Sequence, residues 1–338
     1  GTRPARPGTR RTIIDNPVVD APGGLREGLV IRTSGGRCFV AAGGTTWSCQ
    51  FRGKLKKGKQ VAQSVAVAGD RVLFSPLDGE AGSSGVVEEI LPRRNRISRL
   101  AARRSGGRME QILMANLDQV VVVQSLREPT PQTGLVDRLL MAASRFEVDG
   151  VLVLNKVDLE SPAEETIAWD YYSTLGYRVI RTSAAAGLGI EELRDALVGR
   201  LSIFLGASGV GKSSLLNALD RELALRVAEV TAKTGLGRHT TTHTELFPLP
   251  DGGYIADSPG IRGFDPWDVD PLAVRDYFPE FREAADRCRF RSCLHRDEPV
   301  CGVKDAVAAR RIPSWRYAAY LQVVKDLETR RDESGPRR

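Results

Sequence analysis

The sequence lacks long apolar runs. No segment of its 338 residues approaches the roughly 18 consecutive apolar positions that a membrane-spanning helix needs. The N-terminal residues also lack the apolar core of a secretory signal peptide. These absences favour a cytoplasmic protein with no membrane partner. A chain of this length can bury more than one hydrophobic core, so we expect two or three domains.

Cysteine is scarce, and its distribution argues against disulfides. The five cysteines are an odd number. Cys288, Cys293 and Cys301 cluster around His295, whereas the other two stand apart in the N-terminal third. Three thiolates and one imidazole form the ligand set of a closed tetrahedral Zn²⁺ site, which leaves no position for a reacting water. The cluster therefore predicts one structural zinc ion.

Basic residues outnumber acidic ones. Lys and Arg total 49 against 42 Asp and Glu, and the net charge of +7 favours a polyanionic partner such as nucleic acid. Residues 1–23 have the composition of a basic flexible arm, and two further basic stretches occupy 52–59 and 93–108. Either stretch could lie against RNA phosphates or be an ordinary solvated loop or linker, and the sequence leaves both interpretations open.

Residues 24–95 show short β-prone runs between Gly-rich turns. Strands are expected at Leu29–Ile31, Cys38–Val40, Val61–Val67, Arg71–Phe74 and Val86–Val87. This pattern predicts a small β-barrel of the oligonucleotide/oligosaccharide-binding (OB) type. An SH3-like barrel fits almost as well.

Residues 96–268 alternate buried strands with amphipathic helices. Strands are expected at Val120–Val123, Val151–Leu154, Val179–Ile180 and Ser202–Leu205, helices at Leu135–Phe146, 163–175 and Ile190–Leu197, and a hairpin at Thr242–Pro248 and Tyr254–Asp257. The pattern predicts a doubly wound, mostly parallel α/β sheet. Residues 269–338 are helical again and form the zinc-binding domain. The stripe Tyr317, Tyr320, Leu321, Val324 and Leu327 on the last helix is expected to pack on the domain body.

A phosphate-binding loop of the pattern G-x-x-x-x-G-K-[ST] follows the strand Ser202–Leu205. Its residues are Gly206, Ala207, Ser208, Gly209, Val210, Gly211, Lys212 and Ser213, with Ser214 next in a helix-like run. The glycines let backbone N–H groups converge on phosphate oxygens at the positive end of a helix. Lys212 would contact the β- and γ-phosphates, and Ser213 would bind Mg²⁺.

A guanine-reading motif, Asn155-Lys156-Val157-Asp158, follows the strand Val151–Leu154. Asp158 can accept the adjacent N1–H and N2–H₂ donors of guanine, whereas adenine presents an acceptor at N1, so GTP would be preferred over ATP. Asn155 is expected to brace the loops and the Lys156 stem to cover the base. Ser183 and Ala184, downstream, complete this set.

A third motif, Asp257-Ser258-Pro259-Gly260, ends the expected hairpin. Asp257 would join the Mg²⁺ shell, and the Gly260 N–H would meet the γ-phosphate. The hydroxyl-rich segment 234–242 is expected to close over Mg²⁺ and the γ-phosphate.

The guanine motif precedes the phosphate loop, which is the reverse of their order in an ordinary GTPase domain. The order predicts a circularly permuted GTPase domain at 96–268. It also places the loops that sense the γ-phosphate directly before the zinc-binding domain. A movement of these loops between the GTP and GDP states would therefore be transmitted to that domain through the chain that connects them.

This constellation resembles the small-ribosomal-subunit-dependent GTPase A family (RsgA, also called YjeQ) over nearly the whole chain. The resemblance is carried by Gly237-Arg238-His239-Thr240-Thr241-Thr242, the reversed motif order and Cys288-x₄-Cys293-x-His295-x₅-Cys301. It implies GTP hydrolysis stimulated by the small (30S) ribosomal subunit, rRNA binding, a role in late maturation of that subunit and release after hydrolysis. It also implies that Thr241 is a Mg²⁺ ligand and that His239 lies near the attacking water.

Two positions differ from those of other GTPases. Ile261 stands where many GTPases hold a water-orienting glutamine, so we expect slow intrinsic hydrolysis that His239 or the bound ribosome completes. Gly209 stands where potassium-activated GTPases carry an asparagine, so no K⁺ site is inferred. A monomer is expected. The alternative function is a GTP-gated switch that binds another RNA or protein, while Asp158 disfavours an ATP-dependent kinase or nuclease.

Overall fold

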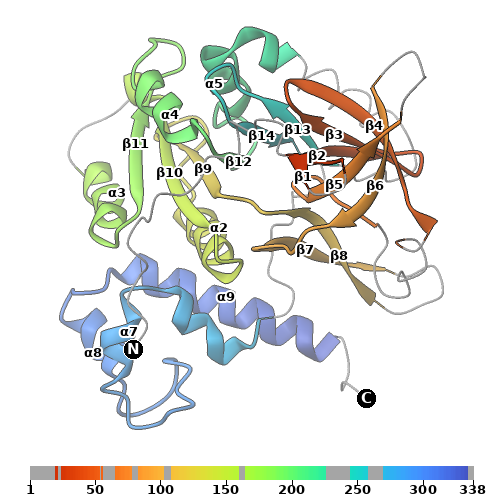
Figure 1. The fold of residues 1–338 in the computed structure, drawn as a ribbon. Helices are drawn as coiled ribbons and strands as arrows, with labels where there is room; N and C mark the ends of the chain where they lie inside the picture. Colours follow the sequence, from red (N-terminus) through yellow and green to blue (C-terminus); the bar gives the residue numbers. More distant parts are fainter. Residues whose placement is uncertain are drawn as a thin grey trace.

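The computed structural model of the chain is shown in Figure 1. It describes residues 20–21, 24–53, 55, 65–77, 83–102, 108–159, 164–225, 244–257 and 269–333. Most of the expected basic arm 1–23, most of the basic stretch 52–59, the segment 234–242 and Gly260 lie outside these residues. Within the described part of the chain, no helix combines the length and the apolar character needed to cross a membrane.

Five strands close into an N-terminal barrel. They are β2 (Leu25–Ser34), β3 (Arg37–Ala42), β4 (Thr45–Phe51), β5 (Arg71–Pro76) and β6 (Ser84–Ile90). Their order is β2-β3-β4-β6-β5, and the pairing of β5 with β2 closes the ring, with the short β1 (Asp20–Ala21) added beside β2. Buried apolar side chains such as Val30, Val40 and Phe74 fill the interior. The predicted OB-type barrel is confirmed.

One expected strand of the barrel was wrong. The third strand is β4, and residues 65–67 of the expected strand Val61–Val67 form a bend and irregular backbone. β3 and β4 are joined by Gly43 and Gly44, whose φ angles of 55° and 73° are those that a tight two-residue hairpin turn requires. The Gly-Gly pair was therefore the available signal for β4.

Cys38 and Cys49 face each other across β3 and β4, and both are free and fully buried in the barrel core. Burial raises the pKa of each thiol to about 12. Since the thiolate is the reactive form, we expect both cysteines to resist alkylation near pH 8 until the protein is unfolded. Mass spectrometry of the alkylated peptides measures this. Rapid modification of either thiol in the native protein would contradict the placement.

The central sheet has the strand order β11-β10-β9-β12-β14-β13. Its strands are β9 (Gln119–Ser125), β10 (Asp149–Asn155), β11 (Arg178–Thr182), β12 (Leu201–Leu205), β13 (Glu245–Pro248) and β14 (Tyr254–Asp257). All neighbours pair in parallel except β13, which is antiparallel to β14. Both β9 and β12 are buried along their whole length, as strands covered on two faces must be.

Helices cover both faces of this sheet (Figure 1). One face packs against α2 (Thr133–Arg145) and α3 (Glu164–Thr174), and the other against α4 (Ile190–Leu197) and α5 (Lys212–Leu219). Alternate residues of β10 serve the two layers, since Leu152 belongs to one core and Val153 to the other. The predicted doubly wound α/β domain is confirmed.

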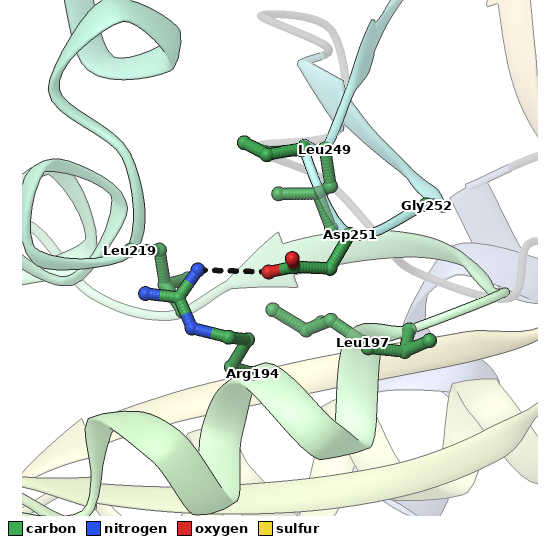
Figure 2. Close-up of a pocket in the computed structure, with 8 residues that line it drawn as sticks. Arg194, Leu197, Leu219, Leu249, Asp251 and Gly252 are labelled. Atoms are coloured by element: carbon green, nitrogen blue, oxygen red, sulfur yellow. Dashed lines mark hydrogen bonds and ion pairs between the residues drawn. The ribbon is translucent and has the colours of Figure 1, made fainter.

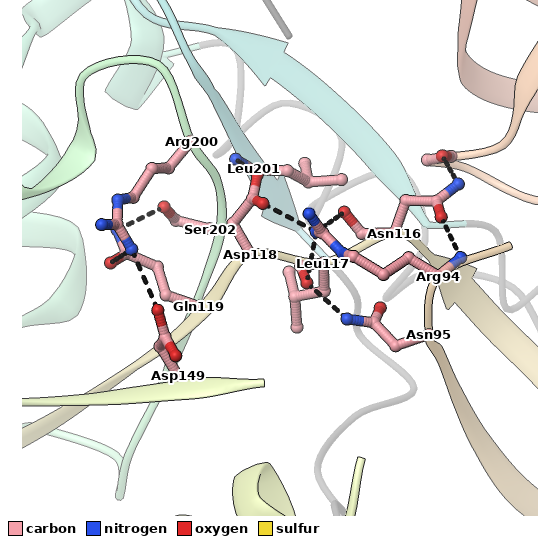
Figure 3. A network of polar contacts seen from close by, with 11 residues as sticks. Arg94, Asn95, Asn116, Leu117, Asp118, Gln119, Asp149, Arg200, Leu201 and Ser202 are labelled. Atoms are coloured by element: carbon pink, nitrogen blue, oxygen red, sulfur yellow. Dashed lines mark hydrogen bonds and ion pairs between the residues drawn. The ribbon is translucent and has the colours of Figure 1, made fainter. Parts of the chain in front are cut away.

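The segment 93–108 is not a plain linker. β7 (Arg96–Ala102) pairs with β8 (Arg108–Ala115) as a separate two-stranded sheet between the barrel and the α/β domain. Just before it, Arg93 donates to the buried Asp70 of the barrel at 2.7 and 2.8 Å. Arg94 donates to Asp118 at 2.7 Å, immediately before β9 (Figure 3). These two arginines, which the sequence offered as candidate phosphate contacts, pair with carboxylates where the barrel meets the sheet.

The C-terminal domain consists of η3 (Pro271–Tyr277), α7 (Phe281–Ala285), α8 (Gly302–Ala308) and α9 (Ser314–Glu333). Of the predicted stripe, Tyr320, Val324 and Leu327 are buried, and they pack with Phe281. Met141, which belongs to α2 of the α/β domain, lies in the same core. The C-terminal domain therefore shares its core with the helix layer that it covers.

Candidate nucleotide and metal sites

The expected nucleotide motifs meet at one edge of the sheet. The phosphate loop follows β12, the guanine motif follows β10, and Asp257 ends β14, so all three lie at the carboxyl ends of parallel strands. Ligands of open α/β sheets bind at this edge. Asn155 Nδ2 donates to the carbonyl oxygen of Val210 at 3.0 Å. The two motifs are therefore in direct contact although they are far apart in the chain.

At two glycines the phosphate loop combines a positive φ with a neighbouring atom too close for any side chain. Gly206 and Gly211 have φ angles of 152° and 98°. A Cβ on Gly206 would lie 2.1 Å from the Val123 carbonyl oxygen, and one on Gly211 would lie 2.2 Å from Asn155 Nδ2. Any larger residue would displace the loop or the guanine motif.

The phosphate loop ends at the N-terminus of α5, where Lys212 and two serines lie. Lys212 begins α5, and its Nζ donates to the carbonyl oxygens of Gly206 at 2.9 Å and Ala207 at 2.7 Å. The ammonium group is thus folded over the loop. Ser213 and Ser214 are exposed in the first turn of α5, where the helix presents free N–H groups. This arrangement suits a polyphosphate with a divalent cation.

Asn155 also joins the guanine motif to the loop after β11. Its Oδ1 accepts hydrogen bonds from Thr182 Oγ1 at 3.2 Å and from the backbone N–H of Ala184 at 3.3 Å. Asn155 is almost fully buried and Ser183 is fully buried, and the Oγ of Ser183 accepts from the Ala186 N–H at 3.1 Å. The buried carboxamide holds three loops in one fixed arrangement.

The other two residues of the guanine motif lie at its open side. The backbone of Lys156 has a φ of 63°, and its Nζ donates to the carbonyl oxygen of Glu128. Asp158 lies in the single turn η1 (Val157–Leu159), is exposed, and has no hydrogen-bond partner among the described residues. Its carboxylate is therefore available to a ligand.

One wall of this site, the loop Leu126–Gln132 between β9 and α2, was not predicted from the sequence. Besides the Lys156 contact to Glu128, a Cβ on Gly209 would lie only 3.6 Å from Pro129 Cδ. Ser125 Oγ donates to the Pro129 carbonyl oxygen at 3.0 Å and fixes the turn. Prolines directly after a buried strand indicate a shaped loop, but a backbone carbonyl such as that of Glu128 has no sequence signature.

The described residues include only some of the expected site residues. His239, Thr241, Gly260 and Ile261 lie outside the described residues. The backbone of Asp257 lies opposite Glu245 of β13, at the end of the strand next to β12. Of the three expected Mg²⁺ ligands, the structure places Ser213, which is exposed, and the backbone of Asp257. Thr241 lies outside the described residues.

The structure brings all four expected metal ligands together. The ligand atoms of Cys288, Cys293, His295 and Cys301 lie within 4.8 Å of one another. His295 Nδ1 is 3.4 Å from the Sγ atoms of Cys288 and Cys301, and these two sulfurs are 3.9 Å apart. A tetrahedral zinc ion places sulfur atoms about 3.8 Å apart and sulfur and nitrogen about 3.5 Å apart. The cluster therefore fits Zn²⁺.

Burial prepares the cluster for a cation. Burial, and to a lesser degree Arg275, lowers the pKa of His295 to about 4, so the imidazole is neutral and can offer a lone pair. Burial also raises the pKa of Cys293 to about 12. Three thiolates without a cation would be costly in this setting, whereas a bound divalent ion would stabilise them.

Neighbouring residues orient the metal loop. Tyr320 Oη donates to the Leu294 carbonyl oxygen at 3.1 Å, and Tyr317 Oη donates to that of His295. The carboxylate of Glu298 accepts from the Leu294 N–H at 2.7 Å and the Arg296 N–H at 2.9 Å. Because both tyrosines belong to α9, that helix positions the metal loop.

A shallow hollow at the other edge of the sheet is separate from these sites (Figure 2). It is lined by Arg194, Leu197, Val198, Leu219, Leu249, Pro250, Asp251 and Gly252. Its polar feature is the 3.1 Å ion pair between Arg194 and Asp251. The residues come from the ends of α4 and α5 and from the turn before β14, so the hollow lies away from the nucleotide motifs.

Known proteins match most of this chain. Residues 27–83 match the family model "RsgA N-terminal domain", and residues 90–267 match "RsgA GTPase". The "Small ribosomal subunit biogenesis GTPase RsgA" of Moorella thermoacetica is 42% identical over 304 residues, 90% of this chain and 98% of that protein. The protein of the same name from Gemmatimonas aurantiaca is 40% identical over 302 residues, 89% and 97% of the two chains.

Two solved structures extend the match to three dimensions. YjeQ from Thermotoga maritima has a TM-score of 0.71 at 34% identity, and the match covers 91% of this chain and all of that one. YloQ, described as a circularly permuted GTPase, has a TM-score of 0.69 at 26% identity over 94% and 98% of the two chains. This chain belongs to the RsgA family of circularly permuted GTPases.

Proposed function

We propose that this protein hydrolyses GTP during late maturation of the small ribosomal subunit in the cytoplasm. It binds the subunit and its rRNA in the GTP state and leaves after hydrolysis. The hydrogen bonds of Asn155 to the phosphate loop and to the loop after β11 carry the nucleotide assignment, because they join phosphate and base recognition. The ribosomal assignment is supported by family membership and by the names of the relatives.

The chemistry follows from the placement of charge around the nucleotide. The loop from Gly206 to Ser214 donates N–H groups to the β- and γ-phosphates, and Lys212 adds a positive charge. Mg²⁺ held by Ser213, Thr241 and Asp257 would neutralise phosphate charge. Gly260 donates to the γ-phosphate and His239 orients the attacking water. Ile261 cannot orient water, so turnover is slow until the ribosomal subunit completes the site.

Base selection depends on the exposed Asp158. Its carboxylate accepts the two guanine donors, while Lys156 covers the base and the loop containing Ser183 and Ala184 borders it. The 3.0 Å hydrogen bond from Asn155 to the phosphate loop keeps this set in register with the phosphates. GTP and GDP both bind, and the site distinguishes them at the γ-phosphate.

We infer that the metal loop offers a surface to RNA. Phe290 is 43% exposed and lies between Arg289 and Arg291, which are also exposed. The Arg289 guanidinium lies 5.5 Å from the ring centroid of Phe290. Exposed aromatic rings and arginines are the groups on which unpaired RNA bases stack. Cys288 and Cys293 flank this turn, so the metal holds it in shape.

GTP turnover with and without small ribosomal subunits tests the proposal. We expect slow turnover by the protein alone, marked stimulation by small subunits, and no stimulation by large subunits. Co-sedimentation should show tighter binding to small subunits with a non-hydrolysable GTP analogue than with GDP. The His239→Ala variant should co-sediment normally and lose the stimulated turnover, because it lacks the group that orients water.

A different experimental result would refute each part of the proposal. Equal co-sedimentation with GDP and the analogue would refute nucleotide-dependent release. Indifference of turnover to ribosomal subunits would favour a GTP-gated switch on another RNA or protein. Full stimulated turnover by His239→Ala would remove that histidine from the mechanism.

A further inference from the structure

A buried group of charges joins the C-terminal domain to the α/β domain. Arg316 of α9 is 1% exposed, and its Nη1 donates to the fully buried carboxylate of Asp137 in α2. Its Nε donates to Glu280 at 2.5 Å, and its guanidinium lies 4.4 Å from the ring centroid of Phe278. Tyr172 of α3 donates its hydroxyl to Asp137 as well. Four segments of the chain therefore meet at one guanidinium.

Because these charges are buried, they restrict the position of the helices that carry them. Removing one member of a buried ion pair leaves the other uncompensated in a medium of low polarity. Burial raises the pKa of Asp137 to about 6, and Arg316 opposes that shift most strongly. The carboxylate of Asp137 thus depends on Arg316 for its charged state, and α2 is held where Asp137 can reach the guanidinium.

Asp137 lies in the second turn of the helix that follows the wall of the nucleotide site. The loop Leu126–Gln132 leads directly into α2, and the Gln132 N–H donates to Gln124 Oε1 at 3.4 Å. Within the same loop, Glu128 accepts from Lys156, and Pro129 packs beside Gly209. A continuous series of contacts therefore runs from Arg316 to both nucleotide motifs.

We propose that Arg316 is a positioning residue for the nucleotide site. By holding Asp137 it fixes the start of α2 and the loop Leu126–Gln132, and through them it sets the affinity for guanine nucleotide. Since coupling between sites is reciprocal, nucleotide binding also stabilises the docked position of the C-terminal domain. The inference rests on the proposed GTP site, and it gives that site a second route to the RNA-facing domain besides the switch loops.

The experiment compares three substitutions in the full-length, zinc-loaded protein. Asp137→Asn keeps the size of the side chain but weakens the link to α2. Glu280→Gln weakens only the part of the network inside the C-terminal domain. Arg138→Ala is the matched control, because Arg138 pairs with Asp326 and so also joins α2 to α9. Zinc content, thermal unfolding, the Kd of a fluorescent GDP and kcat at saturating GTP are measured for each.

We expect Asp137→Asn to weaken GDP binding roughly tenfold, within the usual range of coupling between sites. Its zinc content and its kcat at saturating GTP should match the wild type. Glu280→Gln and Arg138→Ala should change the Kd less than twofold. Arg316→Lys, which retains a positive charge, should lie between the wild type and Asp137→Asn.

Three outcomes would overturn the inference. An unchanged GDP affinity in Asp137→Asn together with a lower unfolding temperature would make the network purely structural. An equal loss of affinity in Arg138→Ala would show a general loosening of the two helices. If Asp137→Asn does not fold, hydrogen exchange of residues 126–132 is measured in Arg316→Lys instead. Protection of these amides equal to that in the wild type would refute the inference. Failure of the wild type to bind GDP at all would instead refute the proposed function.

Discussion

Asp158→Asn is expected to reverse the base preference of the protein. The exposed carboxylate is proposed to accept two guanine donors, and the loss of hydrogen bonds to a charged group costs about 1.5–3 kcal/mol each. GTP affinity should therefore fall on the order of 10²- to 10⁴-fold. The asparagine amide can instead donate to the carbonyl that xanthine carries in place of the guanine amino group. The variant should accordingly bind xanthosine triphosphate more tightly than GTP.

Competition against a fluorescent guanine nucleotide measures this preference, with turnover of each triphosphate as a second readout. Asp195→Asn is the matched control, because Asp195 is likewise exposed but lies on α4. It should bind GTP as the wild type does. If Asp158→Asn kept the preference for GTP, Asp158 would not be the base-reading residue.

Cys301→Ser should unfold the C-terminal domain. A zinc site of this kind contributes roughly 10–16 kcal/mol of apparent binding free energy, and folding of the surrounding segment depends on it. Cys301 also caps α8, since its Sγ accepts from the Lys304 N–H at 3.5 Å. A serine hydroxyl can keep this cap, so the substitution removes chiefly the metal ligand. We expect loss of zinc and fast hydrogen exchange over residues 271–330. Dialysis of the wild type against a chelator should have the same effect.

Guanine nucleotide should still bind to both zinc-free forms, weakened no further than in Asp137→Asn. Cys38→Ala serves as the control, because it removes a buried thiol from the barrel but leaves the metal cluster intact. It should retain zinc. Complete loss of nucleotide binding before any change in residues 271–330 would show that the α/β domain does not fold independently of the metal.

The features that could be predicted from the sequence are those whose conformation depends on residues close together in the chain. The phosphate loop lies between a buried strand and a helix, and its conformation depends on glycines within a few residues of one another. The metal ligands are similarly close together in the chain. Both patterns could be recognised because the residues that each one needs are close together in the chain. Asn155 was expected to brace the loops, and its side chain contacts the phosphate loop.

The missed features depend on contacts that are distant in the sequence. Arg94 and Asp118 lie 24 positions apart and Arg316 and Asp137 lie 179 apart, so nothing near either arginine indicates its partner. β4 was missed because one of its faces carries Thr46, Ser48 and Gln50 and reads as polar. The separate C-terminal domain was expected, but its shared core through Met141 was not.

The pairing of α9 with α2 has a consequence during protein synthesis. The ribosome makes α2 long before α9, so Asp137 and Met141 emerge without the partners that later bury them. Until α9 emerges, the nascent α/β domain exposes a water-solvated carboxylate beside an uncovered apolar patch. Domains generally fold in order from the N-terminus, and exposed apolar surface at that stage promotes aggregation. Completion of this fold therefore waits for the synthesis of α9.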